Sequence, residues 1–378
     1  MKSQTIYFVA GEASADNHGA ALMRSLRESG VDLTFVGRGG PQMRTIAGAQ
    51  FKNWIDDAAV LGLWEVIKKY GYFRGQFRET LDEIENNKPD AVVLIDYPGF
   101  NLRLARALRK QSPKPKIIYY ISPQVWAWNR GRIKKMARFL DLMLCIFPFE
   151  TNLYTKSGLR AVFVGHPMIE RLRATKLKTE RDPHSIGLFP GSRSREVRKI
   201  FPVLLEATRL LLRRQPNLRF EIAAASEALA AEISHALTEA RMREGVFRVV
   251  TGEAAATMQR AFAGIVASGS ATLEAAYFRL PFVLIYKVAW PTYLVARLVV
   301  NVKYLGMPNV LADREVVPEF IQHQAKPDAI AKAVLQLMDN TAARDRMLSE
   351  FDAIIGKLGE SGASEKAAQA IIEEIGED

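Results

Sequence analysis

The sequence predicts an α/β protein of two domains, each built on a parallel sheet. Apolar runs typical of buried strands alternate with helical stretches along the whole chain. The length of 378 residues exceeds what one ordinary core supports. Composition changes from apolar to charged after Gly165-His166-Pro167, so we expect domains at 1–167 and 168–378 with a hinge at the junction.

Each expected element follows from a local pattern of apolar residues. In the first half, strands are expected at Thr5–Ala10, Leu33–Val36, Ala91–Ile95, Ile117–Ile121, Leu142–Phe147 and Ala161–Val164. In the second half, they are expected at Ile186–Phe189, Arg219–Ala223, Phe247–Val250, Gly264–Ala267 and Phe282–Ile285. Helices lie between them, and three polar helices near 326–339, 341–358 and 364–375 end the chain. These last helices pack either on the first domain or on a second subunit, as in a homodimer.

Composition excludes several classes of protein. The single cysteine, Cys145, lies in an apolar run, which excludes an internal disulfide and favours a buried, inert thiol in a reducing, cytoplasmic compartment. The apolar run at Thr5–Ala10 is too short for an export signal, and no window of 18 residues is apolar enough to span a membrane.

Positive charge is concentrated in the first half. Residues 1–167 hold 24 Lys and Arg against 15 Asp and Glu, a net of +9 out of the chain's +11. Between Tyr97 and Leu140 there are eleven basic residues and no acidic one. Such a surface either attracts an anionic partner or is simply solvated. No nucleic-acid motif accompanies it, so an anionic membrane surface or a phosphorylated amphiphile is the favoured partner, and nucleic acid is not expected.

Two glycine- and serine-containing turns carry the strongest functional signal. Gly191-Ser192-Arg193 follows the strand expected at Ile186–Phe189, and Ser268-Gly269-Ser270 follows the strand at Gly264–Ala267. Small residues let backbone N–H groups approach an anion, and the start of the next helix adds partial positive charge. One such turn is weak evidence, whereas two can converge on one diphosphate. Glu274, in the first turns of the second helix, is placed to accept hydrogen bonds from ribose hydroxyls.

Two carboxylates follow strands of the first half. Glu12 and Ser14 lie in the turn Gly11-Glu12-Ala13-Ser14, which lacks the glycine spacing of a dinucleotide site. Asp96 ends the buried strand at Ala91–Ile95, where partial desolvation would raise its pKa toward that of a useful base. The alternatives are that Glu12 only favours the helix start and that Asp96 only caps its turn.

Aromatic residues mark two further segments. Ser122-Pro123-Gln124-Val125-Trp126-Ala127-Trp128 follows a strand and predicts a rigid wall of a ligand pocket, with Trp126 in contact with substrate. The stretch 61–74 is apolar, aromatic and basic together, which is typical of a helix lying on a bilayer and equally of one packed on a core.

Several short motifs occur in the same order as in one protein family. They are Gly11-Glu12-Ala13-Ser14, Gly37-Arg38-Gly39-Gly40-Pro41, Ile95-Asp96-Tyr97-Pro98, the Ser122–Trp128 run, Phe147-Pro148-Phe149-Glu150, Val164-Gly165-His166-Pro167, Pro190-Gly191-Ser192-Arg193 and Pro308-Asn309-Val310-Leu311. With them the chain resembles the bacterial lipid-A-disaccharide synthases. The resemblance implies two facing Rossmann-like domains, the GT-B glycosyltransferase architecture, with the acceptor and the membrane at the first domain and UDP-sugar at the second.

The resemblance also implies a reaction. It joins UDP-2,3-diacylglucosamine to 2,3-diacylglucosamine 1-phosphate (lipid X) with inversion, giving the β-1,6 lipid A disaccharide 1-phosphate and UDP, on the cytoplasmic face of the inner membrane. No metal or other cofactor is expected, and the chain has no D-x-D pair to hold a cation. Positions carried over from the family's motifs, in addition to the turns above, are Arg193, Glu196, Ser270, Thr272, Glu274, Asn309, Glu315 and Gln322.

The expected mechanism assigns the base to the first domain and the leaving group to the second. Asp96, with Glu12, deprotonates the acceptor hydroxyl, and Arg193 with the helix starts stabilises departing UDP. Many members of the family have Asp where this chain has Gly99, which makes Asp96 the better candidate here. The alternatives are another UDP-sugar enzyme of this architecture, an epimerase or a peptidoglycan-type transferase, and a relative that binds nucleotide-sugar without turnover.

Overall fold

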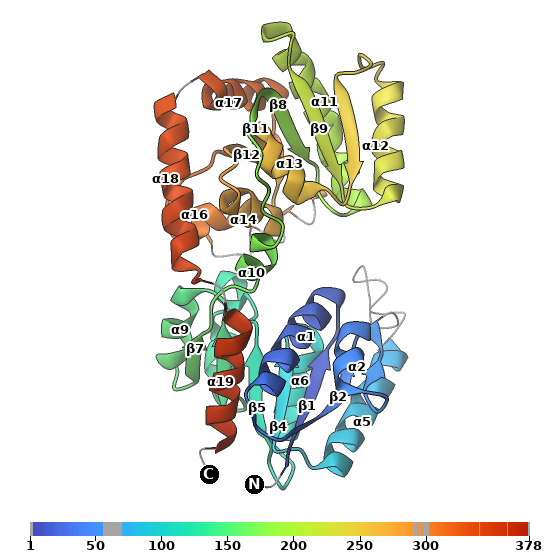
Figure 1. The fold of residues 1–378 in the computed structure, drawn as a ribbon, viewed down its shortest axis with the longest axis vertical. Helices are drawn as coiled ribbons and strands as arrows, with labels where there is room; N and C mark the ends of the chain where they lie inside the picture. The colour runs from blue at the N-terminus through green and yellow to red at the C-terminus, as the bar shows by residue number, and fades with distance from the viewer. Residues whose placement is uncertain are drawn as a thin grey trace. The chain divides into compact units, whose positions relative to one another are not determined.

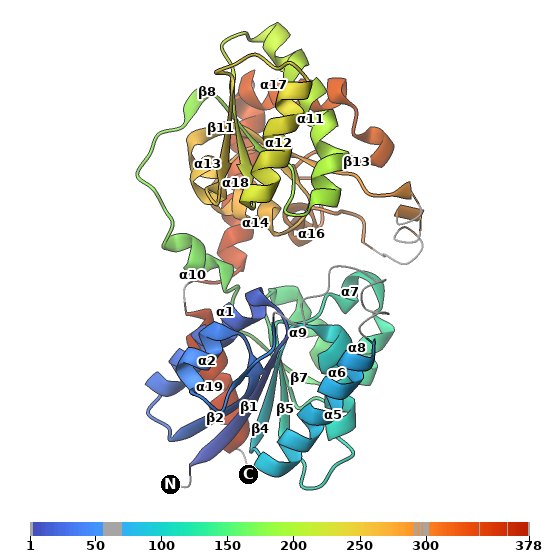
Figure 2. The ribbon, with the colours of Figure 1, turned by 90° about the vertical axis from the view of Figure 1, so that its right-hand side faces the viewer.

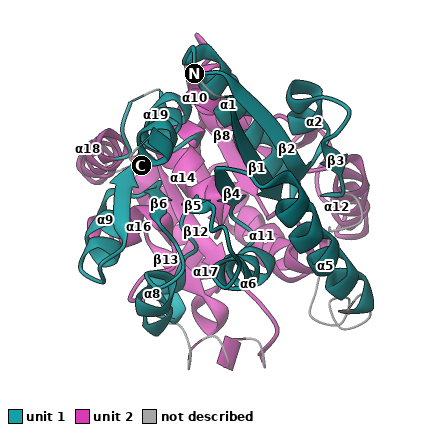
Figure 3. Cartoon of the chain, turned by 90° about the horizontal axis from the view of Figure 1, so that it is seen from below, with its two compact units in different colours: residues 1–167, 358–378 teal, residues 168–357 magenta. Residues whose placement is uncertain are grey.

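The computed structural model describes residues 3–55, 70–290, 293, 294, 297, 302–339, 341–360 and 362–376. The chain divides into two compact units, each with its own parallel sheet (Figure 3). Unit 1 comprises Met1–Pro167 and Leu358–Asp378, and unit 2 comprises Met168–Lys357.

Unit 1 contains a seven-stranded sheet in the order β3-β2-β1-β4-β5-β6-β7. Its strands are β1 (Gln4–Ala10), β2 (Leu33–Gly39), β3 (Lys52–Asn53), β4 (Ala91–Ile95), β5 (Lys116–Tyr120), β6 (Leu142–Cys145) and β7 (Arg160–Phe163). Its helices are α1 (Ala13–Glu28), α2 (Pro41–Ala47), α5 (Tyr70–Asn87), α6 (Pro98–Leu108), α7 (Val125–Trp128), α8 (Gly131–Met136), α9 (Pro148–Thr155) and α19 (Ala363–Gly376).

Alternation along the buried strands of unit 1 divides its core into two layers. In β4, Val93 and Ile95 point to the layer formed with α1, α2 and α19, whereas Val92 and Leu94 point to the layer formed with α5, α6 and α8. The two sets of helices cover opposite faces of the sheet (Figure 2). The last helix, α19, packs beside α1 through residues that include Ala367 and Ile371, so it belongs to unit 1 although it follows unit 2 in sequence (Figure 1).

Unit 2 contains a six-stranded sheet in the order β10-β9-β8-β11-β12-β13. Its strands are β8 (Asp182–Phe189), β9 (Arg219–Ala224), β10 (Phe247–Thr251), β11 (Ala261–Ala267), β12 (Phe282–Tyr286) and β13 (Glu319–Ile321). Its helices are α10 (Met168–Arg173), α11 (Ser194–Arg214), α12 (Glu227–Glu239), α13 (Ala254–Arg260), α14 (Ser270–Tyr277), α16 (Met307–Ala312), the 3-10 turn η1 (Gln322–Gln324), α17 (Pro327–Asp339) and α18 (Thr341–Lys357).

Both sheets have the doubly wound strand order, which confirms the predicted fold class. In each, the order reverses beside the first strand of the unit, between β1 and β4 in unit 1 and between β8 and β11 in unit 2. Loops leave these neighbouring strands in opposite directions, so the carboxyl ends of the strands border a crevice where ligands bind in such sheets. The fold therefore indicates that ligands bind at the turns after β1, β4, β8 and β11.

Differences from the expected elements are confined to ends and short strands. The strand expected to reach Phe147 ends at Cys145, because Pro148 begins α9 and the preceding residues form its entry turn. The two- and three-residue strands β3 and β13 are too short to give a periodic signal. Of the predicted interfacial segment, residues 61–69 lie outside the described residues, and Tyr72 lies half-buried in the first turn of α5.

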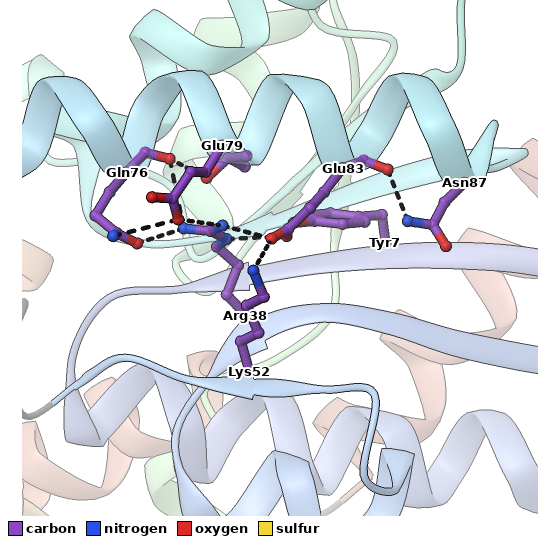
Figure 4. Close-up of polar contacts among 8 residues, drawn as sticks. Tyr7, Arg38, Lys52, Gln76, Glu79, Glu83 and Asn87 are labelled. Atoms are coloured by element: carbon purple, nitrogen blue, oxygen red, sulfur yellow. Dashed lines mark hydrogen bonds and ion pairs between the residues drawn. The ribbon is translucent and has the colours of Figure 1, made fainter.

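A buried arginine joins β2 to α5 in unit 1. The Arg38 side chain is fully buried, and it donates from Nε and Nη2 to Glu83 at 3.1 and 2.7 Å and from Nη1 to Gln76 Oε1 at 2.5 Å (Figure 4). Tyr7 donates its hydroxyl to the same carboxylate at 2.5 Å, and Lys52 forms an ion pair with it. Burial raises the pKa of Glu83, but these donors outweigh it and lower that pKa to about 2. In the glycine-rich segment 37–41, the charge of Arg38 therefore has a structural role, which is to hold β2 to α5.

Candidate active site

In unit 2, both predicted turns line one cavity of about 350 Å³. Gly191, Ser192 and Arg193 follow β8, and Ser268, Gly269 and Ser270 follow β11. The strands are parallel neighbours with Val266 opposite Phe189, so both turns emerge at one edge of the sheet. The cavity is within the size range of small-ligand pockets and lies where the strand order reverses.

Each turn contains a position with a positive φ, a backbone conformation that favours glycine. Gly191 has φ +113°, and a Cβ there would meet Glu196 Oε2 at 2.8 Å. Gly269 has φ +143° and is the N-cap of α14, so the chain enters that helix without a side chain between it and the cavity. The starts of α11 and α14 therefore present backbone N–H groups and partial positive charge at one place.

Three charged side chains line the same cavity. Arg193 Nη1 donates to Glu196 Oε1 at 3.2 Å, and its side chain is 73% exposed, so its guanidinium is accessible to an anion. Glu274 is half-buried and accepts a hydrogen bond at 2.7 Å from Arg171 of α10. The cavity thus combines one exposed cation with carboxylates that can accept hydrogen bonds from hydroxyl groups.

Four predicted residues of unit 2 do not line this cavity. The Thr272 hydroxyl is buried and donates to the Gly269 carbonyl at 2.8 Å. Asn309 is buried, donates to Val317 O and Glu319 Oε1, each at 2.8 Å, and accepts from two backbone N–H groups. Both residues brace turns, because their polar atoms face the protein.

The other two lie at different places. Glu315 is exposed. Gln322 is buried, and its amide exchanges two hydrogen bonds of 3.1 Å with the backbone of Val288. It borders a separate cavity of about 360 Å³ with Lys199, Lys287, Val288, Trp290 and His323.

Part of the cavity wall could not be predicted from the sequence, because its residues have no reactive or charged groups. It is formed by small or apolar residues at the end of β9, after β10 and in α13, namely Ala223, Ala224, Ala225, Gly252, Ala254 and Met258. Alanines that end a strand look like any core residues in a sequence. Only the strand order places them opposite the predicted turns.

In unit 1, Glu12 and Asp96 follow the paired strands on either side of the reversal. Ala10 of β1 lies opposite Ile95 of β4, so the two carboxylates leave the same edge of the sheet. Ser14 donates from Oγ to Glu12 Oε1 at 3.0 Å. The pKa of Asp96 is raised to about 6, first by burial, then by the negative charge of Glu12 and a side-chain hydrogen bond with it. A carboxylate of this pKa is suited to accept a proton near neutral pH.

The turn that carries Asp96 has an unusual backbone. Asp96 and Tyr97 are both in the left-handed region, at φ +46° and +49°, which costs free energy for residues with a Cβ. Two buried donors converge on the Asp96 carbonyl: Asn101 Nδ2 at 2.8 Å and the Tyr119 hydroxyl at 2.5 Å. Asn101 also donates to Ile95 O at 3.2 Å. Neither donor is among the site residues predicted from the sequence, although Asn101 lies five residues after Asp96.

The predicted aromatic wall is anchored by a buried acid. Trp126 is nearly buried and donates from Nε1 to Glu150 Oε1 at 3.0 Å, and the Phe147 N–H donates to Glu150 Oε2 at 3.2 Å. Burial raises the pKa of Glu150 to about 7 against these two donors and Ser122, which lower it. Only a rim of Trp126 is therefore available to substrate.

Comparison with known proteins decides among the chemistries that these sites allow. The model of one protein family, lipid-A-disaccharide synthetase, matches residues 6–372. The chain belongs to this family. The lipid-A-disaccharide synthase of Geobacter sulfurreducens is 39% identical over 99% of this chain and 98% of that protein. That of Myxococcus xanthus is 35% identical over 97% of each chain.

Solved structures agree on the fold. The UDP-GlcNAc 2-epimerase from Neisseria meningitidis, solved with UDP-GlcNAc, has a TM-score of 0.63 at 11% identity, covering 99% of this chain and 100% of that one. The calicheamicin glycosyltransferase CalG4 has a TM-score of 0.60 at 14% identity, covering 100% and 99%. The predicted GT-B architecture is confirmed, and with the family assignment so is the prediction of a lipid A glycosyltransferase; the epimerase and binding-protein alternatives are not favoured.

Among the described residues, no helix combines the length and the apolar character that crossing a bilayer requires.

Proposed function

We propose that the cavity of unit 2 binds the uridine diphosphate of UDP-2,3-diacylglucosamine and that unit 1 activates the 6-hydroxyl of 2,3-diacylglucosamine 1-phosphate. The observation that carries the proposal is the convergence of the two glycine-containing turns on one cavity. Backbone N–H groups at the starts of α11 and α14 hold the diphosphate, and Glu274 accepts hydrogen bonds from ribose hydroxyls. The small residues after β9 and β10 leave room for the flat uracil ring.

In the transfer step, the acceptor oxygen attacks C1 of the donor sugar. The proton of that hydroxyl passes to the Asp96 carboxylate, and the bond between C1 and the diphosphate oxygen breaks with its electron pair on UDP. Arg193 and the helix starts stabilise the charge that develops on the leaving group. Inversion at C1 follows from this single displacement. Glu12 acts through Asp96, since its charge keeps that pKa high enough for proton transfer.

The test is a reaction of the purified chain with both diacylated sugars in detergent, with EDTA present. We expect one UDP released per disaccharide formed. Asp96→Asn should lower kcat by about 10² to 10⁴-fold, the usual contribution of a positioned base. Asp32→Asn, an exposed aspartate between α1 and β2, is the matched control. Turnover of Asp96→Asn within threefold of the wild type would remove Asp96 from this role.

We also propose that the chain works as a peripheral protein on the anionic cytoplasmic face of the inner membrane, because both substrates carry acyl chains and unit 1 holds most of the net positive charge. Flotation with anionic vesicles tests this. The homodimer expected from the sequence stays a prediction, and sedimentation velocity of the purified chain measures it.

A further inference from the structure

A groove on unit 1 combines positive charge with an apolar floor. Its volume is about 540 Å³, and it runs along α6 and α8 from the turn after Asp96. Its lining residues are Pro98, Gly99, Leu102, Arg103, Arg106, Arg109, Lys110, Arg132, Lys135, Met136, Arg138 and Phe139. Seven of these twelve are basic and none is acidic.

The cations of the groove are mostly exposed and share one helix face. Arg103 and Arg106 are three residues apart on α6, so they lie beside one another, and Lys110 follows in the turn after the helix. Like charges at this spacing destabilise a helix. Arg109 forms an ion pair with Asp141 at 2.7 Å. In the described part of the chain, Arg103, Arg106, Lys110, Lys135 and Arg138 have no acidic partner within ion-pair distance.

Apolar groups lie directly beneath and beside these charges. Met136 is buried, whereas Leu102 and Phe139 are half-buried in the floor of the groove. At its margin, the Arg132 guanidinium lies 4.8 Å from the ring centre of Trp128, which is 39% exposed. An exposed tryptophan beside cations is typical of protein surfaces at the level of lipid headgroups.

We propose that this groove is the surface by which unit 1 binds anionic phospholipid. The inference rests on the peripheral membrane contact proposed above and names the residues that make it. One phosphate is matched by about two or three cations, whereas seven line this groove on α6, α8 and the residues that follow each helix, and α6 alone, with eleven residues, is about 16 Å long at 1.5 Å per residue. Several adjacent headgroups therefore match the groove better than a single phosphorylated sugar. Because the groove begins at Pro98, binding there brings the Asp96 turn close to the lipid surface.

The test measures binding of the full chain to vesicles of phosphatidylcholine with and without one third phosphatidylglycerol. The variant combines Arg103→Ser, Arg106→Ser, Lys135→Ser and Arg138→Ser, all at exposed positions. Its matched control combines Arg213→Ser, Arg214→Ser, Arg241→Ser and Arg243→Ser, exposed positions of unit 2, and has the same net charge. A third variant replaces Arg103, Arg106 and Arg138 by Lys. Thermal melting establishes that each is folded, and turnover is measured on substrates dispersed in detergent.

Each basic side chain near an anionic surface contributes about fivefold to binding, so the groove variant, which lacks four of them, should lose about 600-fold in affinity for the anionic vesicles. The unit 2 control and the lysine variant should bind within a fewfold of the wild type, and added salt should weaken binding. Turnover in detergent should persist in every variant.

Equal losses in the groove variant and its control would overturn the proposal, because net charge alone would then explain binding. A raised KM for the acceptor in detergent would also overturn it and assign the groove to the substrate phosphate. A third outcome is that the wild type fails to bind anionic vesicles while its turnover in detergent is intact. That result would overturn both the proposed membrane contact and the proposed role of the groove, and it would leave the transferase proposal in place.

Discussion

Glu12 and Asp96 form an interacting pair of carboxyl groups at the point where the sheet of unit 1 reverses its strand order. The pairing of Ala10 with Ile95 places them side by side, although 84 positions separate them in the sequence (96 − 12). Burial and the charge of Glu12 together raise the pKa of Asp96 to about 6. This pair makes the proposed base dependent on a neighbour, and the dependence can be measured.

The pair predicts the pH dependence of the reaction. Because Asp96 must be ionised to accept a proton, kcat/KM for the acceptor should fall about tenfold per pH unit below a pH of about 6. Glu12→Gln removes the negative neighbour, so the acid limb should move to lower pH. Glu28→Gln, which removes a charge at the exposed far end of α1, should leave the limb in place. A limb unmoved by Glu12→Gln would show that the coupling has no role.

The same raised pKa predicts that Asp96→Asn stabilises the fold at neutral pH. The pKa of Asp96 is 3.8 in the unfolded chain and about 6 in the folded one, so its contribution to the free energy of unfolding is full below 3.8 and is lost as pH rises through 6. The two values differ by about 3 kcal/mol at most, and partial exposure reduces this to about 2 kcal/mol. Asparagine does not ionise and avoids the loss.

Urea unfolding of both proteins at pH 8 and pH 4 measures this difference. The variant should exceed the wild type by about 2 kcal/mol at pH 8 and lose that advantage at pH 4. Stabilities that differ equally at both pH values would contradict the assignment of the raised pKa to Asp96.

Asn101 should act as a positioning residue for Asp96. Asn101→Ala removes the amide that donates to the carbonyls of Ile95 and Asp96, so the left-handed turn can relax and move the carboxylate. We expect kcat to fall about 10 to 100-fold with an unchanged KM for the UDP donor. The free energy of unfolding should fall by about 1–3 kcal/mol.

The control is Asn87→Ala, which also removes an amide hydrogen bond to a carbonyl, at 2.7 Å, but at the exposed end of α5. It should leave kcat unchanged. If Asn101→Ala raises only the KM for the donor, a positioning role for Asn101 is wrong.

Gly191 should be needed for binding of the donor. Gly191→Ala places a Cβ 2.8 Å from Glu196 Oε2 and puts alanine at a φ of +113°, so the Glu196 side chain must move and the turn is strained in the conformation that presents its N–H groups. We expect at least about a tenfold rise in the donor KM, with a smaller change in the KM for the acceptor. Isothermal titration with UDP measures the effect without turnover.

Gly245→Ala is the control because Gly245 has a φ of +74° and open space around its Cβ position. It should cost about 1 kcal/mol of stability, as a left-handed alanine does, and leave UDP affinity unchanged. Equal affinity for UDP in both variants would mean that the turn at Gly191 does not hold the diphosphate.

The sequence by itself determined the parallel α/β class, nearly all the strands and the two turns of unit 2, because each depends on a short local pattern. Apolar runs such as Ala91–Ile95 must be buried, and a small residue between a strand and a helix must turn the chain. The motifs also determined the family, since their order along the chain needs no knowledge of contacts.

Only the tertiary structure decided what each polar side chain faces. Asn309 and Thr272 stand in motifs as Gly191 does, yet their polar atoms are hydrogen-bonded to other groups of the protein, whereas Gly191 borders the cavity. Ala224 and Asn101 carry no signal that marks them as neighbours of the sites, and Glu150 stands in a family motif that does not say what its carboxylate faces. Their roles come from strand order and from hydrogen bonds between distant segments, and the free energy of such contacts depends on burial that one-dimensional spacing does not contain.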